Sequence, residues 1–314
     1  MANATCPPAP PLEVRALGRF GVTVGGKPVV GLDGRRAQEL LTYIVLNRER
    51  VFARDALAET LWGEGCADTR KTLRQVLWQL QSALAGALDT PVLTTDSGFV
   101  GLHPDACVQA DVITVEVAHR MAHAARAEPL DDAVATSLRE AVSDYRGDLL
   151  QHCDTDWCLL ERERLRAMYL AILEKLMVNA EAVGNVSDGL WYGEQVLRHD
   201  RASERTHRRL MALRYLSGDR TGAMRQYESC VRALAEELDV GPGSATRELD
   251  GIIRRGLALQ PADGGVEPMA GVDVLADPLQ TLRVIHATLR DACDQLASAL
   301  TALGDRPTRR RQDG

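Results

Sequence analysis

The stretch from Thr69 to Leu88 combines residue types that could recognise a nucleic acid. It holds three basic residues, Arg70, Lys71 and Arg74, and no acidic one. Arginine and lysine can bind phosphates or the edge of guanine, and glutamine can pair with adenine in the major groove of DNA. This stretch therefore has the chemistry to contact both the sugar-phosphate backbone and the bases.

Helical periodicity divides the same stretch into two faces. At about 100° per residue, the face opposite the basic groups is entirely apolar, from Leu73 to Leu84. A helix that is buried on one side and rich in cations and amides on the other fits a major groove. The competing interpretation is an ordinary amphipathic helix with a solvated face, and the helix alone does not decide between the two. The polar face carries Lys71, Thr72, Gln75, Trp78 and Gln79, flanked by Arg70 and Arg74.

The residues around this helix predict the other elements of a winged helix-turn-helix. Alternating apolar residues predict strands, Gly25 and Gly26 predict a hairpin turn, and Gly63 is expected to end the second helix. Strands, three helices and a final hairpin are typical of a winged helix, which we assign to residues 12–104. The expected elements are strands over 12–17, 20–24 and 27–30, helices over 35–47, 54–62 and 69–84, and a hairpin within 91–102.

The chain beyond residue 110 is predicted to be almost entirely helical. Short breaks rich in Gly and Asp separate the helices, which is typical of paired helices in a repeat array. Ala223, Tyr227 and Cys230 have the small-aromatic-small spacing of a second tetratricopeptide helix. We therefore expect an all-α tetratricopeptide-like helical-repeat domain over residues 105–258. The expected helices are 111–127, 130–145, 156–183, 187–199, 203–216, 221–238 and 244–255.

A separate C-terminal helix is predicted after a Gly/Pro-rich linker at residues 259–277. Over residues 278–304 the apolar residues are spaced alternately three and four apart, which is a heptad seam. Such a seam must be buried, either against the same helix of a second subunit or against the repeat domain as a cap. The linker lets the helix reach away from its own domain, so we favour a homodimer. The expected dimerisation residues are Leu279, Leu282, His286, Leu289, Leu296, Leu300 and Leu303.

Composition argues against a membrane or secreted protein. The 314 residues are 45% hydrophobic and 26% charged, and no apolar run approaches the roughly 20 residues that cross a bilayer. Residues 1–11 lack the features of a secretory signal and are expected to form a disordered tail, as are the basic residues 305–314. Seven scattered cysteines without a C-x-x-C pair indicate reduced thiols and a cytoplasmic location.

The negative net charge of the whole chain argues against nucleic-acid binding, but this average hides a difference between the two parts of the sequence. The whole sequence carries −7, but residues 1–104 hold 11 basic and 10 acidic residues, a balance of +1. Residues 105–314 hold the remaining 26 and 34, a balance of −8. Because DNA affinity depends on local basic surface, the first hundred residues remain compatible with DNA binding.

No other cluster of residues indicates a metal site or an enzyme. His119 and His123 have the spacing of a two-histidine metal site, but no third ligand lies nearby, so we expect a packed or solvated pair. Residues 151–158 could bind zinc, but a helix N-cap supplied within 154–156 is favoured. Cys66 could sense redox state, although a structural role is favoured. Nucleotide-binding and hydrolase motifs are absent, so we expect no enzyme, cofactor or metal.

Several stretches resemble the Streptomyces antibiotic regulatory protein (SARP) family of transcriptional activators. Members join an OmpR-type winged helix to a bacterial transcriptional activation domain of tetratricopeptide character. The resemblance covers roughly residues 12–257, and its most specific part is AMRQYESCVRALAEELDVGP. The other matching stretches include PLEVRALGRFGVTVGGKPV, RRAQELLTYIVLNRERVFARDALAETLW, ADTRKTLRQVLWQLQSAL and LTTDSGFVGLHPDA.

The resemblance implies a cytoplasmic activator that binds double-stranded DNA at promoter repeats, usually as a dimer, and recruits RNA polymerase. It also implies control of a biosynthetic gene cluster. The third helix would read bases, arginines of the first two helices would position phosphates, and the hairpin would form the wing. The implied DNA-binding residues are Arg35, Arg36, Arg50, Arg54, Arg70, Lys71, Thr72, Arg74, Gln75, Trp78, Gln79, Thr94, Thr95 and Ser97.

Two departures from the family pattern keep alternatives open. Family recognition helices usually carry arginines in their later turns, where this chain has Trp78, Gln79 and Gln81, and the wing at 90–104 has no Lys or Arg. Fewer phosphate contacts weaken binding and its salt dependence. One alternative is therefore a helical-repeat interaction module whose winged helix binds DNA weakly or only with a partner. Another is a regulator whose repeat domain senses a small-molecule effector.

Overall fold

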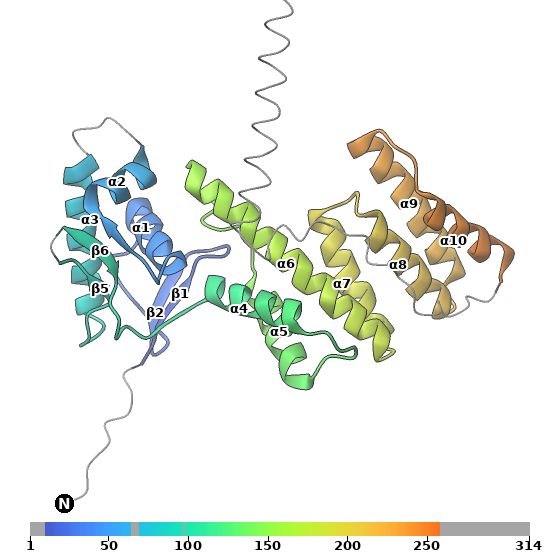
Figure 1. The fold of residues 1–314 in the computed structure, drawn as a ribbon, viewed down its shortest axis with the longest axis horizontal. Helices are drawn as coiled ribbons and strands as arrows, with labels where there is room; N and C mark the ends of the chain where they lie inside the picture. The colour runs from blue at the N-terminus through green and yellow to red at the C-terminus, as the bar shows by residue number, and fades with distance from the viewer. Residues whose placement is uncertain (1–9, 64–68, 97, 258–314) are drawn as a thin grey trace, which may run out of the picture. The chain divides into compact units, whose positions relative to one another are not determined.

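An antiparallel hairpin begins the described part of the chain, which comprises residues 10–63, 69–96 and 98–257 of a computed structural model (Figure 1). Strand β1 (Leu12–Arg15) pairs with β2 (Gly21–Val24), and β2 pairs with the short β3 (Lys27–Pro28). Gly25 and Gly26 form the turn with φ angles of 55° and 76°, which glycine adopts without strain. The predicted hairpin turn is confirmed.

Three helices and a three-stranded sheet complete the winged helix. They are α1 (Arg35–Leu46), β4 (Val51–Ala53), α2 (Arg54–Trp62), α3 (Thr69–Ala85), β5 (Leu93–Thr94) and β6 (Phe99–Leu102). The strand order is β4-β6-β5, all antiparallel. Helix α3 buries its predicted apolar face from Leu73 to Leu84, and all five members are at most 7% exposed. The third strand of this sheet, β4, was not predicted, because three residues are too few to show alternation.

A further strand joins the winged helix to the helices that follow. Strand β7 (Val108–Ala110) pairs in parallel with β1, with Leu12 opposite Val108 and Val14 opposite Ala110. The first sheet therefore has the order β3-β2-β1-β7. Residues 105–110 were assigned to the helical domain without a strand, so this pairing corrects that expectation. Because β7 runs directly into the first helix of the second half, the two halves of the chain share a sheet.

The second half consists of helices that pack on their neighbours in sequence. They are α4 (Asp111–Ala124), α5 (Asp132–Asp144), α6 (Asp156–Ala182), α7 (Val186–His199), α8 (Glu204–Leu216), α9 (Arg220–Leu238) and α10 (Ser244–Arg255). Each of α4–α5, α6–α7 and α8–α9 forms a packed pair, and α10 packs on α8 and α9. The predicted helices are confirmed to within about three residues at each end. The specific tetratricopeptide assignment stays a prediction.

Small residues allow these helices to approach closely. A Cβ atom added to Gly193 of α7 would lie 2.7 Å from Cδ2 of Leu210 in α8, and one added to Gly189 would lie 2.9 Å from Cδ1 of Leu213. In α9, Ala223 and Cys230 are completely buried. The close contact between α7 and α8 therefore depends on glycine.

One hydrophobic core extends from the first sheet through the winged helix into the helical array as far as Leu213. A smaller core of Met211, Ala223, Leu249 and Ile253 lies among α8, α9 and α10. The described residues up to 257 all belong to one compact unit. The division of this unit at residues 104 and 105 stays a prediction.

Several predictions concern residues outside the described ranges. They are the N-terminal tail at 1–11 up to residue 9, the linker at 259–277, the heptad helix at 278–304 with its dimerisation residues, the basic tail, Cys66 and Ser97. Within the described ranges, none of the helices is both long and apolar enough to cross a bilayer.

Candidate nucleic-acid interface

Four side chains on the outward face of α3 are exposed and available to a ligand. They are Lys71, Arg74, Gln75 and Trp78, and the Trp78 side chain is 69% exposed. Among the described residues, none of the four makes a hydrogen bond, an ion pair or a ring contact. The leucines and Val76 of the opposite face anchor the helix in the core, so α3 presents this set on a fixed support.

Two other predicted members of the reading face are tied to the protein itself. Nε2 of Gln79 donates a hydrogen bond of 2.8 Å to the carbonyl oxygen of Gly31, and the side chain is half-buried. The hydroxyl of Thr72 accepts a hydrogen bond of 3.2 Å from Nη1 of Arg36. Gln79 therefore holds the loop after β3 against α3, and its amide is not a free donor as the sequence suggested.

The remaining basic residue of α3, Arg70, forms an ion pair with Asp55 at the start of α2. Nε of Arg70 lies 2.8 Å from Oδ1 of Asp55, and Nη2 lies 2.9 Å from Oδ2. Both side chains are well exposed, at 72% and 65%. Exposed pairs of this kind contribute about 1 kcal/mol or less, so a DNA phosphate could replace the carboxylate as partner. Asp55 was not anticipated from the sequence as part of this surface.

The wing is held to α2 and α3 through Thr95. Nη2 of Arg54 donates to the carbonyl oxygen of Thr95 at 3.0 Å, and Nε2 of Gln81 donates to its hydroxyl at 3.2 Å. The hydroxyl oxygen of Thr94 is buried without a hydrogen-bond partner among the described residues, although the residue itself is partly exposed, and its predicted contact with DNA stays a prediction. Thr95 thus positions the wing.

A cavity of about 280 Å³ opens beside the exposed face of α3. Its apolar wall is formed by Leu73, Leu77 and Trp78. Three arginines stand around it, so it combines apolar surface with positive charge. The other lining residues are Arg54, Asp55, Arg70, Arg74, Gln81 and Thr95.

The structure connects one of the three predicted phosphate contacts around α1 to α3. Arg35 and Arg36 are exposed in the first turn of α1, and Arg36 contacts Thr72 of α3. Arg50 follows the far end of α1, and a helix of this length spans about 18 Å. Arg50 and Glu161 of α6 both influence the pKa of Tyr43 there. Burial raises this pKa, the negative charge of Glu161 raises it further, and the positive charge of Arg50 lowers it. Arg50 therefore lies apart from the other two arginines.

A buried carboxylate fixes the winged helix to the helical array. Asp111, the first residue of α4, accepts hydrogen bonds from the backbone N–H groups of Ala16 at 2.9 Å and Leu17 at 2.8 Å. Burial raises the pKa of Asp111, and these backbone hydrogen bonds partly offset that effect. Leu150 N–H also donates to the carbonyl oxygen of Ala16 at 3.1 Å. The end of β1 is thus held from two separate segments of the second half.

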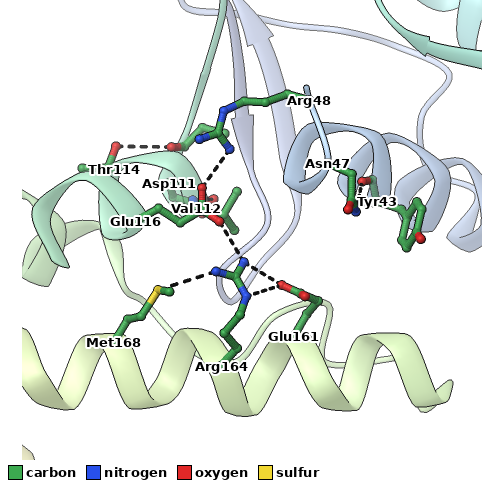
Figure 2. Close-up of polar contacts among 11 residues, drawn as sticks. Tyr43, Asn47, Arg48, Asp111, Val112, Thr114, Glu116, Glu161, Arg164 and Met168 are labelled. Atoms are coloured by element: carbon green, nitrogen blue, oxygen red, sulfur yellow. Dashed lines mark hydrogen bonds and ion pairs between the residues drawn. The ribbon is translucent and has the colours of Figure 1, made fainter. Parts of the chain in front are cut away.

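Four charged residues form a second connection between the halves (Figure 2). Nη1 of Arg48, after α1, lies 2.8 Å from Oε2 of Glu116 in α4. The other oxygen of Glu116 lies 2.8 Å from Nη2 of Arg164 in α6, which also pairs with Glu161 at 2.6 Å. Because Glu116 is only 14% exposed, this network is less screened than a surface ion pair. We call Arg48, Glu116, Arg164 and Glu161 the joint network.

The competing metal sites gain no support within the described residues. No group of three potential ligands is placed to hold a metal ion in that part of the chain. The rings of His119 and His123 lie 6.4 Å apart, and burial lowers the pKa of His119. Thr155 is the N-cap residue of α6, but its hydroxyl contacts Sγ of Cys153 at 3.2 Å and does not cap the helix. The predicted N-cap position within 154–156 is therefore confirmed, but no side-chain hydrogen bond caps the helix there.

Comparison with known proteins identifies the second half of the chain. The solved structure of Mycobacterium tuberculosis EmbR in complex with low affinity phosphopeptide matches with a TM-score of 0.62 and 24% identity, over 80% of this chain and 66% of that chain. This match shows a shared fold. Residues 111–254 match the family described as bacterial transcriptional activator domain. This half of the chain is therefore a bacterial transcriptional activator domain.

The match to the activator domain begins at Asp111, the residue that binds the end of β1. The chain spans 66% of the EmbR chain, so about a third of that protein has no counterpart in the alignment. Among curated proteins, no relative matches the sequence.

Proposed function

We propose that this activator binds double-stranded DNA in a sequence-specific manner by inserting α3 into the major groove. The observation that carries the proposal is the set of four exposed, unpartnered side chains on α3, Lys71, Arg74, Gln75 and Trp78. Lys71 or Arg74 would bind guanine and Gln75 would bind adenine. Arg35, Arg36 and Arg70 would bind phosphates, which set the register of the protein on the duplex.

The finer parts of this function rest on the resemblance to the family. The protein would act in the cytoplasm on promoter repeats, recruit RNA polymerase and control a biosynthetic gene cluster. A homodimer formed by the heptad seam at 278–304 would place two winged helices on adjacent repeats.

A footprint on the DNA upstream of this gene and its neighbours tests the proposal. Wild-type protein should protect a discrete site. Lys71→Ala or Arg74→Ala should weaken binding to that site by roughly 1–3 kcal/mol, so that protection requires more protein. Lys27→Ala is a matched control, because it removes the same charge from the exposed β2–β3 hairpin. If Lys71→Ala and Arg74→Ala bind the protected site as well as the wild type does, α3 is not the reader.

A partner-dependent DNA binder is the second candidate, and the wing supports it. The wing has no Lys or Arg, and Arg54 beside it is engaged with the carbonyl oxygen of Thr95. Such a protein would leave no footprint alone and would protect its site only when RNA polymerase is added. A footprint at moderate salt without polymerase would exclude this candidate.

A further inference from the structure

Trp62, the last residue of α2, stands between a buried carboxylate and an exposed arginine. Its indole Nε1 donates a hydrogen bond of 2.8 Å to Oε2 of Glu39 in α1. The guanidinium carbon of Arg36 lies 5.6 Å from the centre of the indole ring. Nη1 of Arg36 in turn donates to the hydroxyl of Thr72 on α3 at 3.2 Å. These contacts connect the three helices of the winged helix.

Each contact in this chain restricts the next one. Glu39 is only 8% exposed, so its carboxylate is a fixed acceptor that sets the orientation of the indole. The indole face then attracts the guanidinium, and Thr72 fixes the rotation of the guanidinium plane. A guanidinium has five N–H donors, and a single contact, to Thr72, engages them among the described residues. Arg36 is therefore ordered while keeping donors for another partner.

We propose that Trp62 and Glu39 are positioning residues that hold Arg36 ready for one DNA phosphate. This inference rests on the proposed DNA binding and adds which residues prepare one contact. Arginine loses much rotamer freedom when it binds, so ordering it beforehand strengthens binding. The planar fork of Arg36 suits a phosphate, and its bond to Thr72 ties that contact to the helix that reads bases.

The salt dependence of DNA binding tests this role, because each phosphate contact changes the slope of log K against log salt by about 0.9. The probes are the footprinted duplex and a 30-base-pair duplex of random sequence. Arg36→Ala should lower the slope by about 0.9 on both duplexes and weaken binding roughly tenfold. Trp62→Leu should reproduce most of this loss in the full chain.

A double-mutant cycle distinguishes positioning from a general loss of structure. If Trp62 acts through Arg36, Trp62→Leu should cause no further loss when Arg36 is already alanine. Arg35→Ala is the matched control: it removes the neighbouring exposed arginine, and the effect of Trp62→Leu should persist in full on that background. Equal losses on both backgrounds would overturn the inference. If Trp62→Leu does not fold, Trp62→Phe, which keeps a ring and lacks the donor, replaces it in the cycle.

Variants of Glu39 complete the test. Glu39→Gln retains an oxygen acceptor for the indole and should keep the wild-type slope, whereas Glu39→Ala should lose as much as Trp62→Leu. If every variant bound both duplexes as tightly as the wild type and with the same salt slope, the positioning role would be overturned and the proposed DNA binding would stand. Failure of the wild type to bind either duplex at low salt would overturn the proposed DNA binding together with it.

Discussion

Gln75 and Gln79 lie one turn apart on α3, yet the structure uses their amides differently. Gln75 is exposed, and it has no partner among the described residues. Gln79 is half-buried and donates to the carbonyl oxygen of Gly31. The sequence placed both on one polar face, because periodicity reports direction and not the loop that covers part of that face.

Alanine substitution should separate these two glutamines. Gln75→Ala is expected to weaken specific DNA binding by about 1–3 kcal/mol without changing stability. Gln79→Ala is expected to lower the free energy of unfolding by about 0.5–1.5 kcal/mol, because the bond to Gly31 is lost. Gel-shift titrations and urea unfolding measure the two quantities. If Gln79→Ala weakened specific DNA binding and Gln75→Ala did not, the assignment would be contradicted.

Asp111 should be the residue on which the connection between the two halves depends most. Asp111→Ala leaves three buried N–H groups, those of Ala16, Leu17 and Val112, without this acceptor, so we expect a loss of about 1–3 kcal/mol for each group. Asp105→Ala is the control, because that side chain is 87% exposed. Urea unfolding of both variants measures the difference, and equal stabilities would contradict the assignment.

The pH dependence of stability should carry the signature of the same carboxyl. Burial raises the pKa of Asp111 in the folded state, so the folded protein holds this proton more tightly than the unfolded chain does. Stability contributed by protonated Asp111 is therefore lost as pH rises through the raised pKa. The free energy of unfolding of the wild type, relative to Asp111→Asn, should decrease with rising pH over that range. The opposite slope in urea titrations would contradict the raised pKa.

Among the elements, those with long periodic patterns were predictable from sequence and the very short ones were not. The helices from α1 to α10 and the buried face of α3 follow from apolar spacing that extends over several turns. Strands β4 and β7 have three residues each, and their partners are distant in sequence. The link from Glu39 through Trp62 to Arg36 was also missed, because it joins separate helices through side chains.

The contact between α7 and α8 gives a prediction about helix packing. Gly193→Ala should lower the free energy of unfolding by about 1–3 kcal/mol, because the new Cβ would lie 2.7 Å from Leu210. Gly251→Ala in α10 is the control: its nearest neighbour would be the end of Arg255 at 3.4 Å, and helix propensity should make it stabilising by about 0.5–1 kcal/mol. Thermal unfolding of both variants distinguishes packing from propensity.

At the scale of the whole molecule, subunit association is expected to depend on residues 278–304. Sedimentation of the full chain should give a dimer, and a chain ending at Gln260 should give a monomer that still unfolds cooperatively. The heptad seam is the reason, since an apolar stripe of that length would otherwise face water. An unchanged dimer mass after truncation would assign association to another surface.

The parallel pairing of β1 with β7 means that the chain enters and leaves the winged helix at the same place. Together with Asp111 and the joint network, this pairing fixes the winged helix to the activator domain at several points. If the winged helix binds DNA and the activator domain contacts polymerase, the winged helix sets the side of the duplex on which that contact is made. Moving the binding site by half a helical turn, about 5 base pairs, should abolish activation in a reporter assay, and a full turn of about 10.5 should restore much of it. Activation that declines smoothly with distance would mean that the winged helix turns freely relative to the activator domain.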